Sequence, residues 1–356
     1  MNIEKIDIRF DSDVVTFKVT HESGDKEDIK FAYYLHKDGD RIHVEWYNDS
    51  PEFSFKTNGE PGYYRATCFI RASDGTAVMK TSRPVFLNPD IVTDGDVQGK
   101  DLKSAFVFMS DNWEVPMLYY PSTENKLFVL TPSAVDRVTH QLPIFTRFTW
   151  AAQGLFPGKV LCISDPTLAL HDQLELGWCL GSASSDLTGD IARFITDYAR
   201  SVGIPNKNIV IWGSSAGGFS ALSIAARIEN STAVAINPQI EPLRFFNTKQ
   251  VDLVKSIVFP KISDEEIQIQ YKERINALEL KNNGRKFKSV LIQNILDTHH
   301  FDVHSKPYWE GIGGQVAEGW SESGGDLAYF YSDPRGHIAE PESMIPEIVA
   351  KCFPSA

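Results

Sequence analysis

Long apolar runs, paired cysteines and an excess of positive charge are all missing from this chain of 356 residues. No run approaches the roughly 20 apolar residues that a membrane-spanning helix requires. The N-terminal run MNIEKIDIRF alternates charged and apolar residues, so it lacks the apolar core of a signal peptide. We therefore expect a cytoplasmic protein without a transmembrane segment.

The four cysteines are widely spaced and form no CxxC pair. This spacing favours free, mostly buried thiols in a reducing compartment, so we expect neither a zinc site nor disulfides. The formal net charge of -12 opposes binding to a long phosphate backbone or to an anionic membrane surface. We therefore do not expect nucleic acid to be a partner of this protein.

Residues 1 to about 90 contain short β-branched and aromatic runs, separated by turn signals such as Asn58-Gly59 and Asp74-Gly75. The runs occupy residues 14–20, 30–36, 41–47, 52–57 and 62–72. Strands at this spacing predict an antiparallel β-sandwich of immunoglobulin-like type over residues 1–95. The polar stretch 88–101 is typical of a domain boundary. The sandwich residues leave open whether this domain binds a glycan, docks a protein partner or is purely structural.

After residue 102, apolar runs alternate with helical periods, which predicts a mostly parallel sheet with helices on both faces. The strand candidates are residues 104–110, 126–132, 159–165, 208–213, 233–238, 289–294 and 327–333. We assign residues 96–356 to this α/β domain. A helical insertion around 249–283 is expected between two core strands, where such segments often cap a site.

Ser215 lies at the centre of a GxSxG pattern, Gly213-Ser214-Ser215-Ala216-Gly217. Residues 208–212 are typical of a buried strand and 219–229 of a helix, so the pattern falls on a strand-to-helix turn. This context favours a nucleophile over a Gly- and Ser-rich turn that only closes a βα unit. The helix N-terminus favours developing negative charge, and the amide of Ala216 is the expected first oxyanion donor.

A serine nucleophile needs a histidine to take its proton and a carboxylate to orient that histidine. With the serine on a turn of this kind, the expected chain order is serine, acid, histidine. His337 follows the last predicted strand, and Asp297 follows the strand before it, so these two residues are the predicted base and acid. Asp302 and Asp333 are the alternative acids, and the alternative bases are His299, His300 and His304.

The second oxyanion donor is expected in the loop after residues 126–132. No HGGG-type run occurs there, and the candidates are the backbone amides of Ser133 and Ala134.

The run GSSAGG, Asp297, His337 and the layout of the chain from residue 102 onward resemble the α/β-hydrolase superfamily of serine enzymes. The runs ISDPTLAL, LGWCLG, GSSAGGFSAL and INPQI resemble its bacterial glycan O-acetyltransferase-like branch, found in capsule biosynthesis and accessory secretion systems. The resemblance implies acyl transfer to or from a sugar hydroxyl through an acyl-Ser215 intermediate. It implies no required cofactor, with acetyl-coenzyme A as acyl donor if the protein is a transferase.

Trp178, Trp309 and Trp320 fall in predicted loops, where exposed indoles stack on sugar rings, although packing beneath the loops is an equal alternative. In the dense cluster of His299, His300, Asp302 and His304, alternate residues would share one face of an extended segment, as metal ligands do. A serine nucleophile leaves a metal no step to perform, so we expect this loop to line the pocket. The predicted substrate-binding residues are Trp178, His300, His304 and Trp309.

The chain is acidic but contains a basic island, which is expected to be a solvated helix end or a site for coenzyme A or an anionic glycan. Its residues are Lys281, Arg285, Lys286 and Lys288.

Three functions are compatible with these features. The leading one is acyl transfer or ester hydrolysis on a glycan. The second is an intracellular esterase or peptidase acting on small substrates. The third is a non-catalytic scaffold that keeps the fold. This function is disfavoured because all three predicted triad positions are occupied by residues that can carry out the chemistry.

Overall fold

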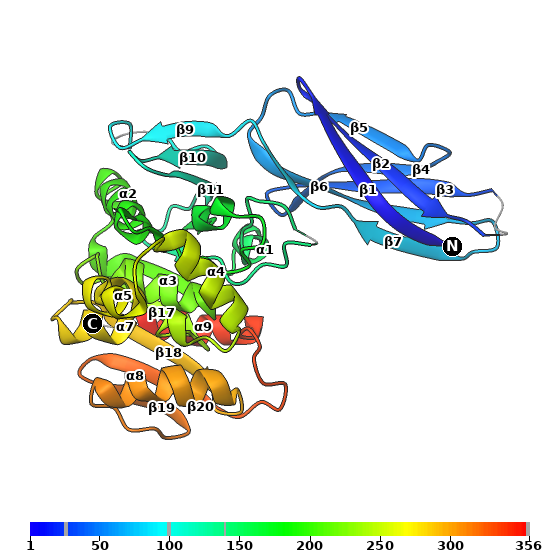
Figure 1. Cartoon of the computed structure of the whole chain (residues 1–356). Helices are drawn as coiled ribbons and strands as arrows, with labels where there is room; N and C mark the ends of the chain where they lie inside the picture. The colour runs from blue at the N-terminus through cyan, green and yellow to red at the C-terminus, as the bar shows by residue number, and fades with distance from the viewer. Residues whose placement is uncertain (25–27, 98–100, 139, 354–356) are drawn as a thin grey trace. The chain divides into compact units, whose positions relative to one another are not determined.

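The computed structural model describes residues 1–24, 28–97, 101–138 and 140–353, which form two compact units (Figure 1). The first unit consists mainly of Met1–Asp90, and the second comprises most of the chain that follows. The stretch expected to be a boundary contributes a strand, β9 (Asp90–Thr93), to the sheet of the second unit, and its residues 98–100 lie outside the described residues. The domain limits at 95 and 96 stay predictions.

The first unit contains two antiparallel sheets whose buried side chains form one core. The first sheet has the order β1 (Asn2–Asp11), β2 (Val14–Glu22), β5 (Glu52–Lys56). The second has the order β4 (Asp40–Asn48), β3 (Lys30–Lys37), β6 (Gly62–Arg71), β7 (Ala77–Thr81), and β8 (Val85–Leu87) pairs with β6.

Phe17 from the first sheet stacks on Phe53, which in turn stacks on Tyr33 from the second sheet, and all three side chains are buried. Alternate residues of β2 are buried, as expected for a strand with one face on the core. The N-terminal part is therefore β-rich, as predicted, whereas the immunoglobulin-like assignment stays a prediction.

The second unit is built on a ten-stranded mixed sheet with the order β19-β20-β18-β17-β16-β12-β13-β11-β10-β9. The strands not yet placed are β10 (Ala105–Met109), β11 (Glu114–Tyr120), β12 (Leu127–Leu130), β13 (Lys159–Ile163), β16 (Ile209–Ser214), β17 (Thr232–Ile236), β18 (Lys288–Asn294), β19 (Gly319–Ser323) and β20 (Asp326–Tyr331). The strands from β13 to β20 along this order run parallel, whereas β11 is antiparallel to β13 and β19 to β20.

Both faces of the central strands are covered. Successive side chains of a strand point to opposite faces, yet every residue of β12, β16 and β17 is buried. This explains why these strands are continuous apolar runs in the sequence, as is typical of parallel sheets. The alternation of apolar runs and helical periods predicts a mostly parallel sheet with helices on both faces, whereas the observed sheet is mixed, with parallel strands at its centre and antiparallel pairing of β11 and of β19 with their neighbours.

Helices and short elements connect the strands. The first half contains α1 (Phe148–Ala152), η1 (Pro166–Leu170), β14 (Gly181–Ser182), β15 (Ser185–Asp186), α2 (Leu187–Ser201), η2 (Asn206–Asn208) and α3 (Ala216–Ala225). Between β17 and β18 lie η3 (Pro242–Arg244), α4 (Thr248–Val258), α5 (Asp264–Gln270), α6 (Lys272–Ile275) and α7 (Ala277–Asn282). The C-terminal part adds the π-helix η4 (His300–Ser305), α8 (Lys306–Gly311), η5 (Glu342–Met344) and α9 (Ile345–Cys352).

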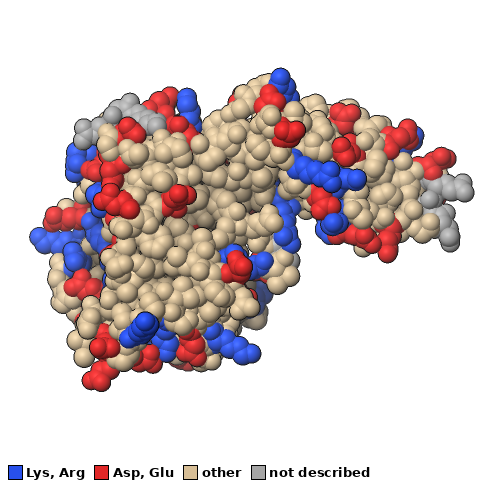
Figure 2. Space-filling model, turned by 45° about the horizontal axis from the view of Figure 1, so that its top comes forward, with Lys and Arg blue, Asp and Glu red and all other residues tan. Residues whose placement is uncertain are grey.

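The structure bears on the expectations for membrane-spanning helices, cysteines and surface charge. None of the helices in the described part of the chain is both long and apolar enough to span a membrane. Cys68, Cys162, Cys179 and Cys352 are buried thiols, as their spacing predicts. On the face drawn in Figure 2, basic and acidic side chains are interspersed and the basic ones do not merge into a continuous patch.

Candidate active site

Ser215 occupies a strained turn between β16 and α3. Its backbone has φ 54° and ψ -120°, a conformation that residues with a side chain rarely adopt. Hydrogen bonds hold the turn, since the Ser215 amide donates to Ile236 O at 2.9 Å and its carbonyl accepts from the amides of Gly218 and Gln239. The strand-to-helix turn predicted from the GxSxG pattern is therefore present.

The turn requires glycine at position 213. A Cβ atom there would overlap Thr131 Oγ1 and the carbonyl of Gly217. The Thr131 hydroxyl donates to Gly217 O at 2.7 Å, which ties the start of α3 to the end of β12. Close approach of these backbones thus explains the residue type at this position.

No side chain caps the N-terminus of α3. The first amides of a helix have no partner within the helix and carry partial positive charge, so the amide of Ala216 is placed to receive an anionic oxygen. On the facing loop, the Ser133 amide donates to Thr146 Oγ1 at 3.2 Å, whereas Ala134 is exposed. Ser133 would have to exchange this partner before its amide could donate to an oxyanion.

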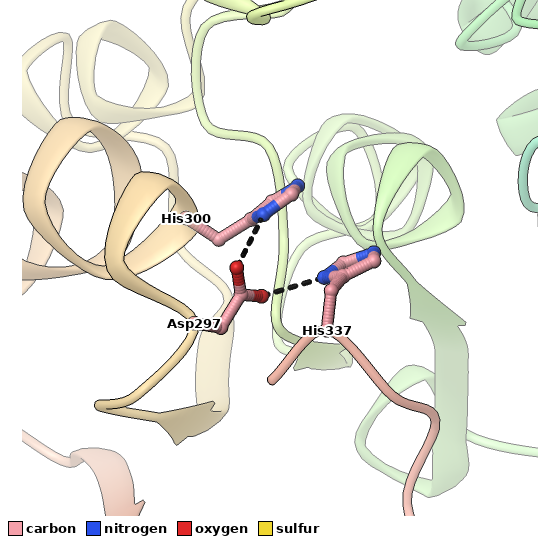
Figure 3. Close-up of side chains that lie close together, drawn as sticks. All are labelled: Asp297, His300 and His337. Atoms are coloured by element: carbon pink, nitrogen blue, oxygen red, sulfur yellow. Dashed lines mark hydrogen bonds and ion pairs between the residues drawn. The ribbon is translucent and has the colours of Figure 1, made fainter. Parts of the chain in front are cut away.

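Asp297 lies directly after β18 and accepts hydrogen bonds from two histidines (Figure 3). His337 Nδ1 lies 2.6 Å from Asp297 Oδ2, and His300 Nδ1 lies 3.0 Å from Asp297 Oδ1. The two imidazole rings stack, with centroids 4.0 Å apart and planes within 13° of parallel. The side chain of His337 is 41% exposed, whereas those of Asp297 and His300 are buried.

The electrostatics of this cluster favour an ionised acid and a neutral His300. Burial acts to raise the pKa of Asp297, but the hydrogen bonds from His300 and His337 outweigh burial and hold that pKa well below its ordinary value. Burial also lowers the pKa of His300, against the opposing effect of Asp297. Asp297 therefore fixes both imidazoles with Nδ1 protonated, which leaves Nε2 of each ring as an acceptor.

The loop that carries His337 is anchored from three sides. Asn294, at the end of β18, donates to the carbonyls of Asp333 and Gly336 at 2.8 Å each. Asn237, after β17, donates to Ile338 O at 2.7 Å. These hydrogen bonds fix a segment that has no regular secondary structure. They explain how an irregular loop can hold His337 against Asp297.

A buried ion pair provides the third anchor. Glu340 accepts from Trp212 Nε1 at 2.6 Å and from Arg147 Nε at 2.8 Å, and Arg147 Nη2 completes a bidentate pair. The Arg147 and Glu340 side chains are 4% and 0% exposed. Trp212 directly precedes the turn of Ser215, so this pair links the two loops of the site.

The alternative acids lie elsewhere. Asp302 is exposed, and Asp333 pairs with Arg335 at 2.6 Å. Residues 300–305 form a π-helix, so the extended geometry considered for a metal site does not occur. In the described part of the chain, the ligand atoms of Asp297, His300 and His337 lie within 4.8 Å of one another. The lone pairs of parallel stacked rings run side by side instead of converging, so this cluster fits hydrogen bonding better than metal binding.

Two tryptophans predicted to present their indoles to a sugar are buried. Trp178 is 1% exposed and Trp309 is 0% exposed, so the expectation of exposed stacking faces is wrong for both. The Trp309 indole donates to Gln315 O and packs against Phe330. Trp320 is half-buried and donates to Glu347. The apolar neighbours that cover these indoles come from distant parts of the chain, which loop assignment from sequence does not reveal.

The other histidines of the cluster are also covered. His300 and His304 are each 1% exposed, and Nδ1 of His304 lies 3.4 Å from the amide of Glu241. Burial lowers the pKa of His304 to about 3. Their predicted contact with substrate hydroxyls therefore requires an approach that this structure does not leave open.

One residue near Ser215 was not predicted from the sequence. Nε2 of Gln239 lies 3.4 Å from Ser215 Oγ and 3.5 Å from His300 Nε2, so both groups are within reach of one amide. No motif identifies a lone glutamine after a strand, and the run INPQI, which contains Gln239, carries only a resemblance to a family.

Each cation of the basic island has a partner. Lys281 pairs with Asp326 at 2.8 Å, Arg285 with Glu273 at 3.0 Å and Lys286 with Glu229 at 3.6 Å. Lys288 donates to Lys351 O. These contacts engage the cations within the chain, which disfavours the interpretation of the island as an anion site; the alternative, a solvated helix end, does not describe Lys281, whose side chain is 12% exposed.

The chain order and the strand positions of Ser215, Asp297 and His337 resemble those of α/β-hydrolase-type serine enzymes, as the sequence indicates. No model of a protein family and no curated protein matches this sequence. Similar solved structures include the capsule O-acetyltransferase of Neisseria meningitidis serogroup A, at 14% identity and TM-score 0.48, over 70% of this chain and 95% of that chain. Porphyromonas gingivalis dipeptidyl peptidase 4 is similar at 12% identity and TM-score 0.48, over 98% of this chain and 49% of that chain. Prolyl oligopeptidase B from Galerina marginata is similar at 10% identity and TM-score 0.47, over 98% of this chain and 57% of that chain. At these identities and TM-scores, the similarities assign neither a family nor an activity to this chain.

Proposed function

We propose that this protein is a serine enzyme that forms an acyl-Ser215 intermediate and passes the acyl group to a hydroxyl group or to water. The hydrogen bond between His337 Nδ1 and Asp297 Oδ2 carries the proposal, because it leaves Nε2 of His337 as the proton acceptor. Ser215 gives its proton to this nitrogen as Oγ attacks the acyl carbon. The amide of Ala216, together with that of Ser133 or Ala134, then stabilises the resulting oxyanion.

The substrate proposal is transfer of an acetyl group to, or its removal from, a hydroxyl of a bacterial surface or capsule glycan. It rests on the resemblance of ISDPTLAL, LGWCLG, GSSAGGFSAL and INPQI to the glycan O-acetyltransferase-like branch. Acetyl-coenzyme A is the proposed donor for transfer, and no step is assigned to a metal. We propose residues 96–356 as the catalytic domain and the cytoplasm as its location. An immunoglobulin-like first domain would bind the glycan or a protein partner.

Hydrolysis of a small ester or peptide is the second candidate. The partial exposure of the His337 side chain favours it, because solvent then has access to the base that would activate a water molecule. Transfer and hydrolysis share one acyl-enzyme, so the two candidates differ only in what resolves it.

A fluorophosphonate probe tests the shared step. We expect labelling of the wild-type protein and none of the Ser215→Ala variant. An unlabelled wild type would refute the proposal that this protein is a serine enzyme. Acetyl release from acetyl-coenzyme A and from 4-nitrophenyl acetate is then measured with and without oligosaccharide acceptors. Acetylated oligosaccharide as product supports the transferase, whereas release that no acceptor changes supports the hydrolase.

A further inference from the structure

Gln239 lies against the turn of Ser215, directly after β17. Its side chain is 0% exposed. Its backbone amide donates to Ser215 O at 3.2 Å, so the two residues are fixed to each other through the main chain. Its side-chain amide lies between Trp178, Ser215 and His300. A buried amide with three polar neighbours has a defined orientation, which decides what it offers to Ser215.

Trp178 sets the orientation of this amide. An indole N–H only donates, and Trp178 Nε1 lies 2.5 Å from Gln239 Oε1. The oxygen of the amide therefore faces Trp178, and the NH₂ group faces the other side. Two donors are thereby directed at Ser215 Oγ, 3.4 Å away, and at His300 Nε2, 3.5 Å away.

His300 has a matching protonation state. Its Nδ1 faces the carboxylate of Asp297 and its Nε2 faces the NH₂ group of Gln239, so the ring proton sits on Nδ1 and Nε2 accepts. Burial, which lowers the pKa of His300, favours the same neutral form. His300 is thus engaged at both nitrogens, whereas His337 keeps Nε2 available for the proton of Ser215.

Trp178 is itself held in a strained turn. Trp178 and Cys179 have φ 51° and 52°, in the left-handed region that side chains disfavour. The buried carboxylate of Asp165 stabilises the turn by accepting from the amides of Cys179 and Thr167 at 2.9 Å each. Residues held in such strained conformations cluster at functional sites. The strained turn fixes the indole N–H of Trp178 on Gln239 Oε1.

We propose that Gln239 is a catalytic residue whose side-chain N–H stabilises the charge that develops on Ser215 Oγ. As Oγ gives its proton to His337 Nε2 and forms the bond to the acyl carbon, the carbonyl electron pair moves to the acyl oxygen. When that pair returns, the bond from the acyl carbon to the leaving group breaks, and His337 gives its proton to the leaving group. A hydroxyl group or water then gives its proton to His337 and bonds to the acyl carbon; the Oγ–C bond breaks, its electron pair returns to Oγ, and His337 returns the proton to Oγ. Gln239 donates to Oγ at both stages, and Trp178 is its positioning residue.

This inference rests on the proposed function, and substitution of Gln239 tests it separately. Gln239→Met keeps the length of the side chain but removes both donors. We expect the second-order rate of fluorophosphonate labelling to fall by about 10- to 100-fold, less than for a short oxyanion-hole contact. Gln250→Met is the matched control, since Gln250, on α4, accepts from the amide of Glu175 and donates to the carbonyl of Gln173, outside the contacts of Gln239. Its labelling rate should equal that of the wild type.

Gln239→Glu adds a second measurement, the pH dependence of the labelling rate. A purely structural role of Gln239 would not change this pH dependence. The ionised carboxylate has no donor to offer Oγ, whereas the protonated form has one. The ratio of variant to wild-type labelling rates should therefore rise as the pH falls from 8 to 5. Trp178→Phe removes the indole donor and should give a smaller loss than Gln239→Met, because the amide can then turn away from Ser215.

The outcomes separate the two proposals. A wild type labelled at Ser215, together with a folded Gln239→Met variant labelled at the same rate, overturns the role of Gln239 and leaves the proposed function intact. An unlabelled wild type overturns both. If Gln239→Met does not fold, a ratio for Gln239→Glu that stays constant with pH overturns the role of Gln239.

Discussion

Asp297 is the residue on which both imidazoles of the site depend, since each donates its Nδ1 proton to one carboxylate oxygen. Asp297→Asn keeps the size of the side chain but places an NH₂ group against one of these nitrogens, which favours the wrong histidine tautomer. If Asp297 is the acid of the proposed Ser-His-Asp triad, we expect fluorophosphonate labelling of Ser215 to slow by about 10³- to 10⁴-fold. Asp302→Asn is the control, because Asp302 is exposed. Equal losses in the two variants would contradict the assignment of Asp297.

Glu340 is a second residue whose loss has a defined cost. Glu340→Ala leaves the Arg147 guanidinium buried without its carboxylate partner, and breaking a buried pair costs about 3–5 kcal/mol. We expect a drop of this size in the free energy of unfolding, measured by urea denaturation. Arg335→Ala removes an exposed ion pair from the same loop and should change stability little. A Glu340→Ala variant as stable as Arg335→Ala would show that the buried pair is dispensable.

The pairing of Asp297 with His337 could be predicted from the sequence, because each follows an apolar run and adjacent parallel strands end at the same sheet edge. The positions of Trp178 and Gln239 could not. Trp178 depends on a left-handed turn held by Asp165, and Gln239 acquires its orientation only from Trp178. Such dependence on distant partners leaves no periodic or motif signal in the sequence.

The π-helix η4 carries a testable pH dependence of stability. Burial lowers the pKa of His304 from 6.5 to about 3, so between these values the unfolded chain binds a proton that the folded protein does not. Its contribution is therefore complete above pH 6.5 and is lost as the pH falls toward 3. We expect His304→Gln to reduce the loss of unfolding free energy between pH 7.5 and 5.5 by about 1 kcal/mol.

His171→Gln controls for the loss of a histidine at an exposed position. If the pH dependence of unfolding in His304→Gln equals that of the wild type, His304 is not the group that titrates.

The sequence identifies some strands better than others, and the exposure of their side chains to solvent explains the difference. The central strands β16, β17 and β18 are apolar because both of their faces are covered, and all three were predicted. The sequence does not indicate β11, which contains Pro116, or β19, an edge strand with the polar sequence GWSES. Proline and polar residues are typical of loops, so only pairing with a neighbouring strand reveals these two elements.

At the scale of the whole molecule, each unit has its own buried core. The first unit is centred on residues such as Phe17 and Tyr33, and the second on the central strands of its ten-stranded sheet. Trp46 is the one tryptophan of the first unit and is 70% exposed, so tryptophan fluorescence reports mainly on the second unit. Two cores with separate contacts are expected to unfold in separate steps.

Phe17→Ala tests this expectation, because it removes a fully buried ring from the first core at a cost of about 3–5 kcal/mol. We expect a step in far-ultraviolet circular dichroism to move to lower urea concentration, while the tryptophan fluorescence midpoint and the labelling rate of Ser215 stay as in the wild type. Phe128→Ala, in the buried strand β12, should instead move the fluorescence midpoint. If Phe17→Ala shifted both probes together, the two cores would have to unfold as one cooperative unit, and the domain limits inferred from the sequence would lose their thermodynamic meaning.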